Sequence, residues 1–258
     1  IADGVSEWGW RFGMNPREFA EGVMSGAKAT AERLRHEGPM PPTKRASISM
    51  AEGHAGVTAF GAATAIIAAL DVTGSEVGVA NLGDSSLRQL RRLPGAPMMT
   101  VIERTQEQQH KFGQPFQLSR IPTPNEYPEL VAAGKTKLVQ AVKAATARGL
   151  KLDEPEHAQT YSFEVEEGDL FILGSDGLFD NLDDTAMLEI VTKVSEESPE
   201  DLPRVAEELA REASRIAATE GVETPFSKAA VAAGYQCVGG VVDDITVIVA
   251  RISKRSYQ

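Results

Sequence analysis

Cysteine and histidine are scarce in this chain of 258 residues. Its one cysteine, Cys237, excludes a disulfide framework within the chain and favours a reducing, intracellular setting. The four histidines stand far apart in the sequence, and none has the spacing of zinc ligands. The sequence therefore predicts neither a disulfide-stapled scaffold nor a zinc protein.

Long apolar runs and an excess of basic residues are also lacking. The longest nearly apolar run, residues 59–70, is too short to span a bilayer, so we expect no membrane insertion. Lys and Arg number 26 against 37 Asp and Glu, a net charge of −11. This balance argues against a nucleic acid as partner, because such partners require a basic face.

The chain lacks an initiating methionine and begins at Ile1, inside a stretch typical of a strand. We therefore expect the N-terminal part to be missing, and a cytoplasmic, mitochondrial or plastid location is not resolved. The length lies at the upper end for one domain, and the 42% of hydrophobic residues is ordinary for a globular protein. We expect a single domain over residues 1–258 that is a monomer.

Four aspartates, spread over almost the whole chain, each lie beside a glycine or another aspartate and next to an apolar stretch. They are Asp3, Asp84, Asp176 and Asp243. The apolar stretches are typical of strands, so each carboxylate is expected at a strand end. Carboxylates gathered there repel one another unless a cation lies between them, and hard cations such as Mg²⁺ or Mn²⁺ suit all-oxygen ligands. One Gly-Asp pair is more often a plain turn, but four favour a shared site.

The first half of the chain predicts a helix followed by strands. Asn15 caps a helix with Pro16 at its first position. Its buried face is expected at Phe19, Val23, Ala27, Thr30 and Leu34. Residues 62–70, 77–82 and 86–92 read as successive strands of an antiparallel meander, with turns at Gly74 and Gly83.

The second half predicts a hairpin, three helices and a last strand. Residues 158–165 and 170–173 are expected to pair, with Asp169 playing a structural role in the turn. Helices are expected after Asp183-Asp184, after Asp201 and at Thr224-Pro225. Residues 244–252 form a final strand. This mixture indicates an α+β fold with helices packed on antiparallel sheets.

One segment, residues 125–155, stands apart. It follows several prolines and predicts a helix over about residues 129–148 that is rich in Ala and Lys. This suits an inserted, flap-like segment. Its basic residues suit a phosphorylated or acidic partner, and its alternative role is to cover an apolar surface through Leu130, Leu138 and Val142.

The aspartate-containing stretches resemble the motifs of the PPM (type 2C) family of metal-dependent serine/threonine phosphatases. The matching runs are Asp3-Gly4, Ala80-Asn81-Leu82-Gly83-Asp84-Ser85, Ser175-Asp176-Gly177-Leu178-Phe179-Asp180 and Asp243-Asp244-Ile245-Thr246-Val247. Their order and approximate spacing agree over nearly the whole chain. Three further runs resemble a branch common in mitochondria and plastids: Glu107-Gln108-Gln109-His110, Pro115-Phe116-Gln117-Leu118-Ser119 and Thr224-Pro225-Phe226.

The resemblance implies a four-layer αββα sandwich and the hydrolysis of phosphoserine and phosphothreonine in a phosphoprotein substrate. It implies two or three Mn²⁺ or Mg²⁺ ions. In that arrangement Asp3 bridges two ions and Gly4 offers its carbonyl oxygen, while Asp176 and Asp243 hold the second ion. Asp84 helps Asp176 to bind the third, looser ion. Asp3, Asp176 and Asp243 are thus the expected catalytic residues.

Two nearby aspartates have weaker assignments. For Asp180 we favour a structural role, capping the following turn. Asp244 is a candidate for orienting Asp243.

Three departures from the family pattern bear on activity. The upstream Arg and acidic residue of the first family motif are not in this chain. Val5 stands where many members have a histidine, so no general acid is identified. Ser6-Glu7 replaces a Gly-Gly pair, and Glu7 either adjusts metal or substrate preference or, as we favour, faces solvent.

These departures keep a second reading open: a catalytically weak phosphatase-like domain that binds a partner or a phosphopeptide. A generic divalent-cation-binding protein is disfavoured. An EF-hand, for example, takes its carboxylates from about a dozen consecutive residues.

Overall fold

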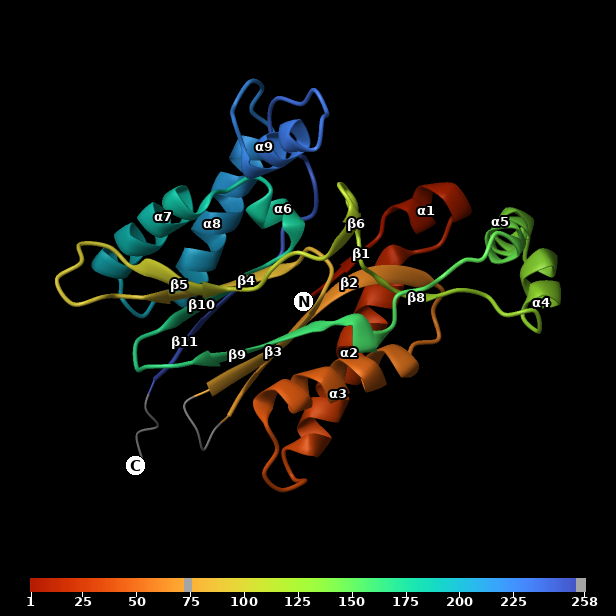
Figure 1. Cartoon of the computed structure of the whole chain (residues 1–258), viewed down its shortest axis with the longest axis horizontal. Coiled ribbons are helices and arrows are strands. Elements are labelled where there is room, and N and C mark those ends of the chain that lie inside the picture. Colours follow the sequence, from red (N-terminus) through yellow and green to blue (C-terminus); the bar gives the residue numbers. More distant parts are fainter. Residues whose placement is uncertain (72–75, 254–258) are drawn as a thin grey trace.

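The computed structural model describes residues 1–71 and 76–253, which form two antiparallel sheets with helices on their outer faces (Figure 1). The first sheet has the order β1 (Ala2–Gly4), β2 (Gly61–Leu70), β3 (Glu76–Leu82) and β9 (Gln159–Glu164), and β8 (Leu118–Arg120) also pairs with β2. The second has the order β11 (Val247–Arg251), β10 (Leu170–Gly174), β4 (Ser86–Arg91) and β5 (Thr100–Arg104).

Each sheet has its own pair of covering helices. Helices α2 (Pro16–Leu34) and α3 (Pro42–Ala55) pack on each other and on the first sheet. Helices α7 (Asp184–Glu197) and α8 (Leu202–Ala217) pack on each other, and α8 lies against β11 of the second sheet. The expected α+β fold with a layered αββα arrangement is confirmed (Figure 1).

The alternation of side chains along the strands separates three hydrophobic cores. In β10, Leu170 and Ile172 face α7 and α8, whereas Phe171 and Leu173 face the other sheet. In β2, Ile66 likewise joins the core between the sheets, while its neighbours point toward α2 and α3. Successive side chains leave a strand on opposite faces, so both sheets are covered on both sides.

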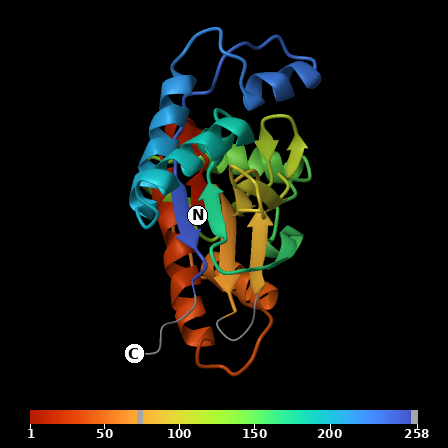
Figure 2. The same ribbon diagram turned by 90° about the vertical axis from the view of Figure 1, so that its left-hand side faces the viewer.

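Several helix boundaries follow from the capping residues that the sequence indicated. The side chain of Asn15 accepts a hydrogen bond from the Arg17 amide at the start of α2. Asp183 and Asp201 cap α7 and α8 in the same manner, and Thr224 caps α9 (Pro225–Ala232). Figure 2 shows α9 beyond the ends of the strands, above the rest of the chain.

Helix α3 was not expected from the sequence. Its buried positions include Ala46, Ser49 and Gly53, which give little hydrophobic periodicity. A Cβ atom added to Gly53 would lie 2.6 Å from the carbonyl oxygen of Val23, so glycine is what allows α3 to approach α2 this closely.

Two strand pairings expected from the sequence are wrong. β3 and β4 do not form a meander, because the chain crosses at Gly83 from the first sheet to the second. Likewise β9 pairs with β3 and β10 with β4, so residues 158–173 form no hairpin. Neighbouring strands of a sandwich can belong to different sheets, which alternation alone does not reveal. The predicted turn at Gly74 lies outside the described residues.

The segment of residues 125–155 contains two helices where the sequence predicted one. They are α4 (Tyr127–Ala132) and α5 (Thr136–Ala147), and Gly134, with φ of 78°, separates them. The Nζ atom of Lys135 donates a hydrogen bond to the carbonyl oxygen of Gly13 over 2.6 Å, which ties this helical hairpin to the end of α1 (Glu7–Phe12).

Short elements complete the fold: β6 (Gln109–Lys111), β7 (Gln114–Pro115), the 3₁₀ turn η1 (Pro155–His157) and α6 (Asp176–Phe179). Within residues 1–71 and 76–253, no helix combines the length and apolar character that a membrane crossing requires.

Candidate metal centre

The four predicted aspartates lie at strand ends of the two sheets. Asp3 belongs to β1, Asp84 follows β3, Asp176 follows β10, and Asp243 precedes β11. Gly174 at the end of β10 pairs with Val247 and with Ser86. This register brings the end of β10 beside the start of β11 and of β4, so three of the aspartate-bearing loops meet at one end of the sandwich.

A cavity of about 450 Å³ lies at this end, and three of the four predicted aspartates line it: Asp84, Asp176 and Asp243. Asp3 lines a neighbouring hollow of about 260 Å³ together with Gly4 and Asp244. The carboxyl groups of Asp3 and Asp176 share a hydrogen bond. The two hollows are thus joined through this pair of side chains, one from each sheet.

Two further carboxylates line the main cavity, Asp180 and Glu107. The sequence favoured a structural role for Asp180, capping the following turn; in the structure Asp180 ends α6 and also lines the cavity. Glu107 follows β5 in a loop whose Gln108 amide donates to the carbonyl oxygen of Gly83 over 2.8 Å. That contact holds Glu107 beside Asp84. Only the neighbouring run of Gln residues pointed to this loop in the sequence.

Burial and like charge raise the pKa values of this cluster. Burial, with a further contribution from Asp176, raises the pKa of Asp3 to about 8. The same two causes raise the pKa of Asp180 to about 8 and that of Asp84 to about 7. The pKa of Asp176 is raised by burial and by Asp243. At neutral pH, several members therefore hold a proton rather than a charge.

The donor set fits a hard divalent cation. All the cluster's side-chain atoms that could act as ligands are carboxyl oxygens, which Mg²⁺ and Mn²⁺ prefer, and a cation would displace the bound protons. Over residues 1–71 and 76–253, no three such side chains already stand in the arrangement that an ion requires.

Contacts between the end of β10 and the residues before β11 hold Asp176 and Asp243 near each other. The buried Ser175 donates through Oγ to the carbonyl oxygen of Asp244 over 3.0 Å and accepts from the Thr246 amide over 3.1 Å. A Cβ atom on Gly177 would lie 2.5 Å from that same carbonyl oxygen. Glycine beside Asp176 is therefore needed for the approach of another loop. The Asp244 amide donates to Asp243 Oδ1 over 2.8 Å, which orients the Asp243 carboxylate.

Gly4 and Glu7 lie on the Asp3 side of the site. A Cβ atom on Gly4 would lie 2.7 Å from the carbonyl oxygen of Pro16, so this glycine lets the start of α2 approach β1. Glu7 forms an ion pair with Arg11 on the exposed surface of α1. It lines neither hollow, in keeping with the solvent-facing role that we favoured.

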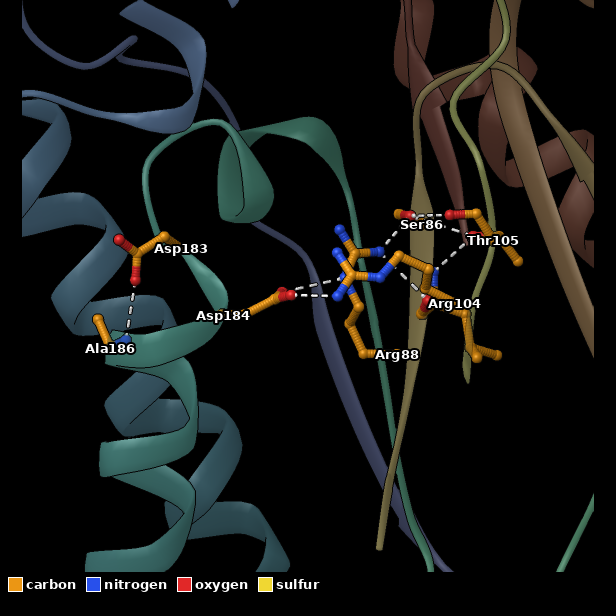
Figure 3. A network of polar contacts seen from close by, with 8 residues as sticks. Ser86, Arg88, Arg104, Thr105, Asp183, Asp184 and Ala186 are labelled. Atoms are coloured by element: carbon orange, nitrogen blue, oxygen red, sulfur yellow. Dashed lines mark hydrogen bonds and ion pairs between the residues drawn. The ribbon is translucent and has the colours of Figure 1, made fainter. Parts of the chain in front are cut away.

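Arg88 and Arg104 form a polar network around Asp184 (Figure 3). Arg88 Nε donates to Asp184 Oδ1 over 3.2 Å, and Arg104 Nη2 lies 2.5 Å from Asp184 Oδ2. The Arg88 guanidinium also stands 4.4 Å from the ring centroid of Phe179 and opposes the raised pKa of Glu107. Arg88 thus offsets part of the negative charge from behind the cavity wall.

Asp169 has the structural role that we expected. It is buried and accepts hydrogen bonds from Arg91 Nε and Nη2, each over 2.7 Å, and from Gln89. These bonds tie the turn before β10 to β4, away from the cavity.

Comparison with known proteins places the chain in a family. The family profile described as "Protein phosphatase 2C" matches residues 152–222. The protein phosphatase PTC7 homologues of Xenopus laevis and Homo sapiens are each 33% identical to the chain over 260 residues. Both alignments cover 98% of the chain, with 76% and 74% of the respective relative.

A solved structure of a phosphatase has the same fold as this chain. The X-ray structure of the photosystem II phosphatase PBCP superimposes with a TM-score of 0.73 at 25% identity, and the match covers 98% of this chain and 85% of that one. Sequence similarity and fold therefore lead to the same conclusion: the chain belongs to the PPM (type 2C) family of protein phosphatases.

Proposed function

We propose that this chain hydrolyses phosphoserine and phosphothreonine in proteins, and that it uses two or three Mn²⁺ or Mg²⁺ ions held by the carboxylate cluster. The observation that carries the proposal is the cavity lined by Asp84, Asp176, Asp180 and Asp243 with Glu107. Folding gathers these groups although burial and mutual repulsion raise several of their pKa values. Such an arrangement is expected where cations are to be bound.

The proposed assignment of ligands follows the family resemblance, and the two hollows support it. Asp3 would stand between two ions, because its carboxyl group reaches Asp176 of the other sheet by a hydrogen bond. Asp176 and Asp243 would hold the second ion, and Gly4 would offer its carbonyl oxygen to the first. Asp84 would hold a looser third ion with Asp176. Two divalent ions supply a water molecule of lowered pKa and neutralise the charge that develops on the phosphoryl oxygens.

The remaining roles belong to groups that hold these carboxylates in place. Ser175 fixes the loop of Asp244 against the end of β10. The Asp244 amide fixes one oxygen of Asp243, which leaves the other oxygen available to an ion. Arg88, which does not line the cavity, interacts electrostatically with Glu107, which does. We expect Arg88 to limit the total negative charge that an incoming phosphate group meets.

The test compares phosphoserine, phosphothreonine and phosphotyrosine peptides in Mn²⁺ and in excess EDTA. We expect release of phosphate from the first two in Mn²⁺ only. Binding of the peptides without any phosphate release would favour instead the catalytically weak phosphatase-like domain. Release of phosphate in EDTA would contradict the metal assignment.

A further inference from the structure

The cavity that contains the carboxylate cluster has two unlike walls. Its acidic wall comes from the strand ends. Its apolar lining, called the apolar wall below, comes from Phe112, Pro115, Phe226, Ala229 and Val241. Phe112 lies in the turn between β6 and β7, while Phe226 and Ala229 belong to α9. An apolar surface thus stands directly beside the groups proposed to act on phosphate.

The aromatic part of this wall is not part of the interior. The ring centroid of Phe112 lies 5.4 Å from that of Phe226 and 5.3 Å from that of Tyr235. Within the described part of the chain, none of the three rings belongs to the hydrophobic cores. Tyr235 is 56% exposed. Apolar surface that is kept beside a cavity and outside the core is typical of a binding site.

The wall is also held in a fixed place. The His110 ring stacks on Phe116 at a centroid distance of 4.0 Å, and its Nε2 lies 3.0 Å from both carboxylate oxygens of Asp153. These contacts brace the hairpin that carries Phe112. On the other side, the Phe226 amide donates to the carbonyl oxygen of Asp180 over 3.0 Å. The apolar wall is therefore anchored directly to the acidic loop.

We propose that the wall formed by Phe112 and Phe226 binds an apolar side chain next to the phosphorylated residue of the substrate. The protein then prefers phosphosites with aliphatic or aromatic neighbours. This inference rests on the proposed function, because the acidic half of the same cavity receives the phosphate group. Phe112 and Phe226 are specificity residues in this account, and they take no part in the chemistry.

The charge around the cavity favours an apolar residue next to the phosphorylated residue over an acidic or a basic one. An acidic neighbour would be repelled by a chain whose net charge is −11. A basic neighbour would gain little once bound cations neutralise the cluster. An apolar neighbour gains from burial against the aromatic rings whether or not ions are bound.

The experiment compares two phosphoserine peptides that differ only in the residues on each side of the phosphoserine, both Leu in one and both Ser in the other. We expect kcat/KM with Mn²⁺ to favour the Leu peptide by about tenfold, the effect of partly burying one such side chain. A third peptide with Lys on both sides should behave like the Ser peptide.

Four variants test whether the apolar wall causes the preference for the Leu peptide. Phe112→Ala and Phe226→Ala should each bring the ratio close to one, mainly by lowering kcat/KM for the Leu peptide. Phe112→Leu should keep most of the ratio, because it keeps an apolar side chain. Trp10→Ala removes an aromatic ring that is 75% exposed on α1 and lines neither hollow, so it should leave the ratio unchanged. If Phe226→Ala lowers the melting temperature, the ratio is measured with the Phe112 variants alone, because Phe112 lies in a hairpin turn.

Binding of the same peptides separates this inference from the proposed function. In these probes a non-hydrolysable phosphonate replaces the phosphate, and calorimetry in Mn²⁺ gives the ratio of their Kd values. If the wild type binds the Leu probe more tightly and Phe112→Ala loses this preference, the inference is supported even when no peptide is hydrolysed. Hydrolysis with equal kcat/KM for Leu and Ser peptides overturns the inference and leaves the proposed function standing. A preference for the Lys peptide, or equal losses on all peptides in Phe112→Ala, overturns it too.

Discussion

Replacing Asp180 by asparagine should stabilise the metal-free protein, and the gain should grow with pH. Burial and the neighbouring carboxylates raise the pKa of Asp180 from its ordinary 3.8 to about 8 in the folded state. Between these two values the unfolded chain has lost the proton that the folded chain still binds. Stability therefore falls as pH rises through this window, and above it the penalty is complete.

The size of the effect follows from the difference between the pKa of Asp180 in the folded state and in the unfolded state. Each unit of pKa difference corresponds to about 1.4 kcal/mol, so a shift from 3.8 to about 8 gives an upper value of roughly 6 kcal/mol at high pH. The neighbours Asp176, Glu107 and Asp84 contribute to the same repulsion, and they can relax when one charge is removed. We expect a gain of about 2 to 5 kcal/mol at pH 8 and less than about 1 kcal/mol near pH 4.

The assay is urea unfolding in EDTA at several pH values between about 4 and 8. Asp183→Asn is the matched control: it is the same substitution in the same loop, at the cap of α7, where asparagine caps equally well. The control should follow the wild type at every pH. A variant at Asp180 that is no more stable than the wild type at pH 8, or whose gain does not depend on pH, would refute the electrostatic account of the cluster.

Three further predictions concern metal and substrate. Asp176→Asn or Asp243→Asn should each abolish phosphopeptide hydrolysis and weaken Mn²⁺ binding, because a hard cation loses a charged oxygen; near-normal turnover at limiting Mn²⁺ would show that the assignment is wrong. Asp84→Ala should lower turnover but leave two tightly bound ions by calorimetry, and the loss of a tight ion would instead place Asp84 in the ligand set of the main pair. A Gly/Ser linker in place of residues 125–150, which spares Asp153, should leave hydrolysis of a small aryl phosphate nearly intact. The same linker should weaken dephosphorylation of a phosphoprotein several-fold, because residues 125–150 hold four basic residues, Lys135, Lys137, Lys143 and Arg148, against two carboxylates. Equal losses on both substrates, or a fall in melting temperature, would assign the two helices to the core.

Local signals predicted the elements of the fold better than their pairing. The cap at Asn15 and the spacing from Phe19 to Leu34 located α2, because both depend on residues close together in the sequence. The partner of β3 depends on where the chain turns after Gly83. That glycine has φ of 109°, and a Cβ atom there would lie 2.6 Å from Thr64 Cγ2. The glycine was visible in the sequence, but the crossing between sheets that it permits was not.

The same limit applies to the candidate site. Asp84, Asp176 and Asp243 were found because each follows or precedes an apolar strand beside a glycine or another aspartate. Asp180 was given a structural role, capping the following turn, and only the position of the cavity shows that it faces the cluster. Glu107 lies in a run that resembles a branch of the family, but that run gave no sign that its carboxylate faces the cluster. It reaches the site through the contact of Gln108 with Gly83, which joins segments far apart in the sequence.

The most direct test of the central claim counts bound Mn²⁺ and measures hydrolysis of a phosphoserine peptide in one titration of the metal-stripped protein. Our account predicts no turnover without metal, and a rate that rises as the ions held by Asp3, Asp176 and Asp243 fill their sites. It also predicts that Asp183→Asn follows the wild-type curve and that Asp243→Asn loses both binding and rate. Full turnover in the stripped protein, or unchanged Mn²⁺ binding in Asp243→Asn, would contradict it.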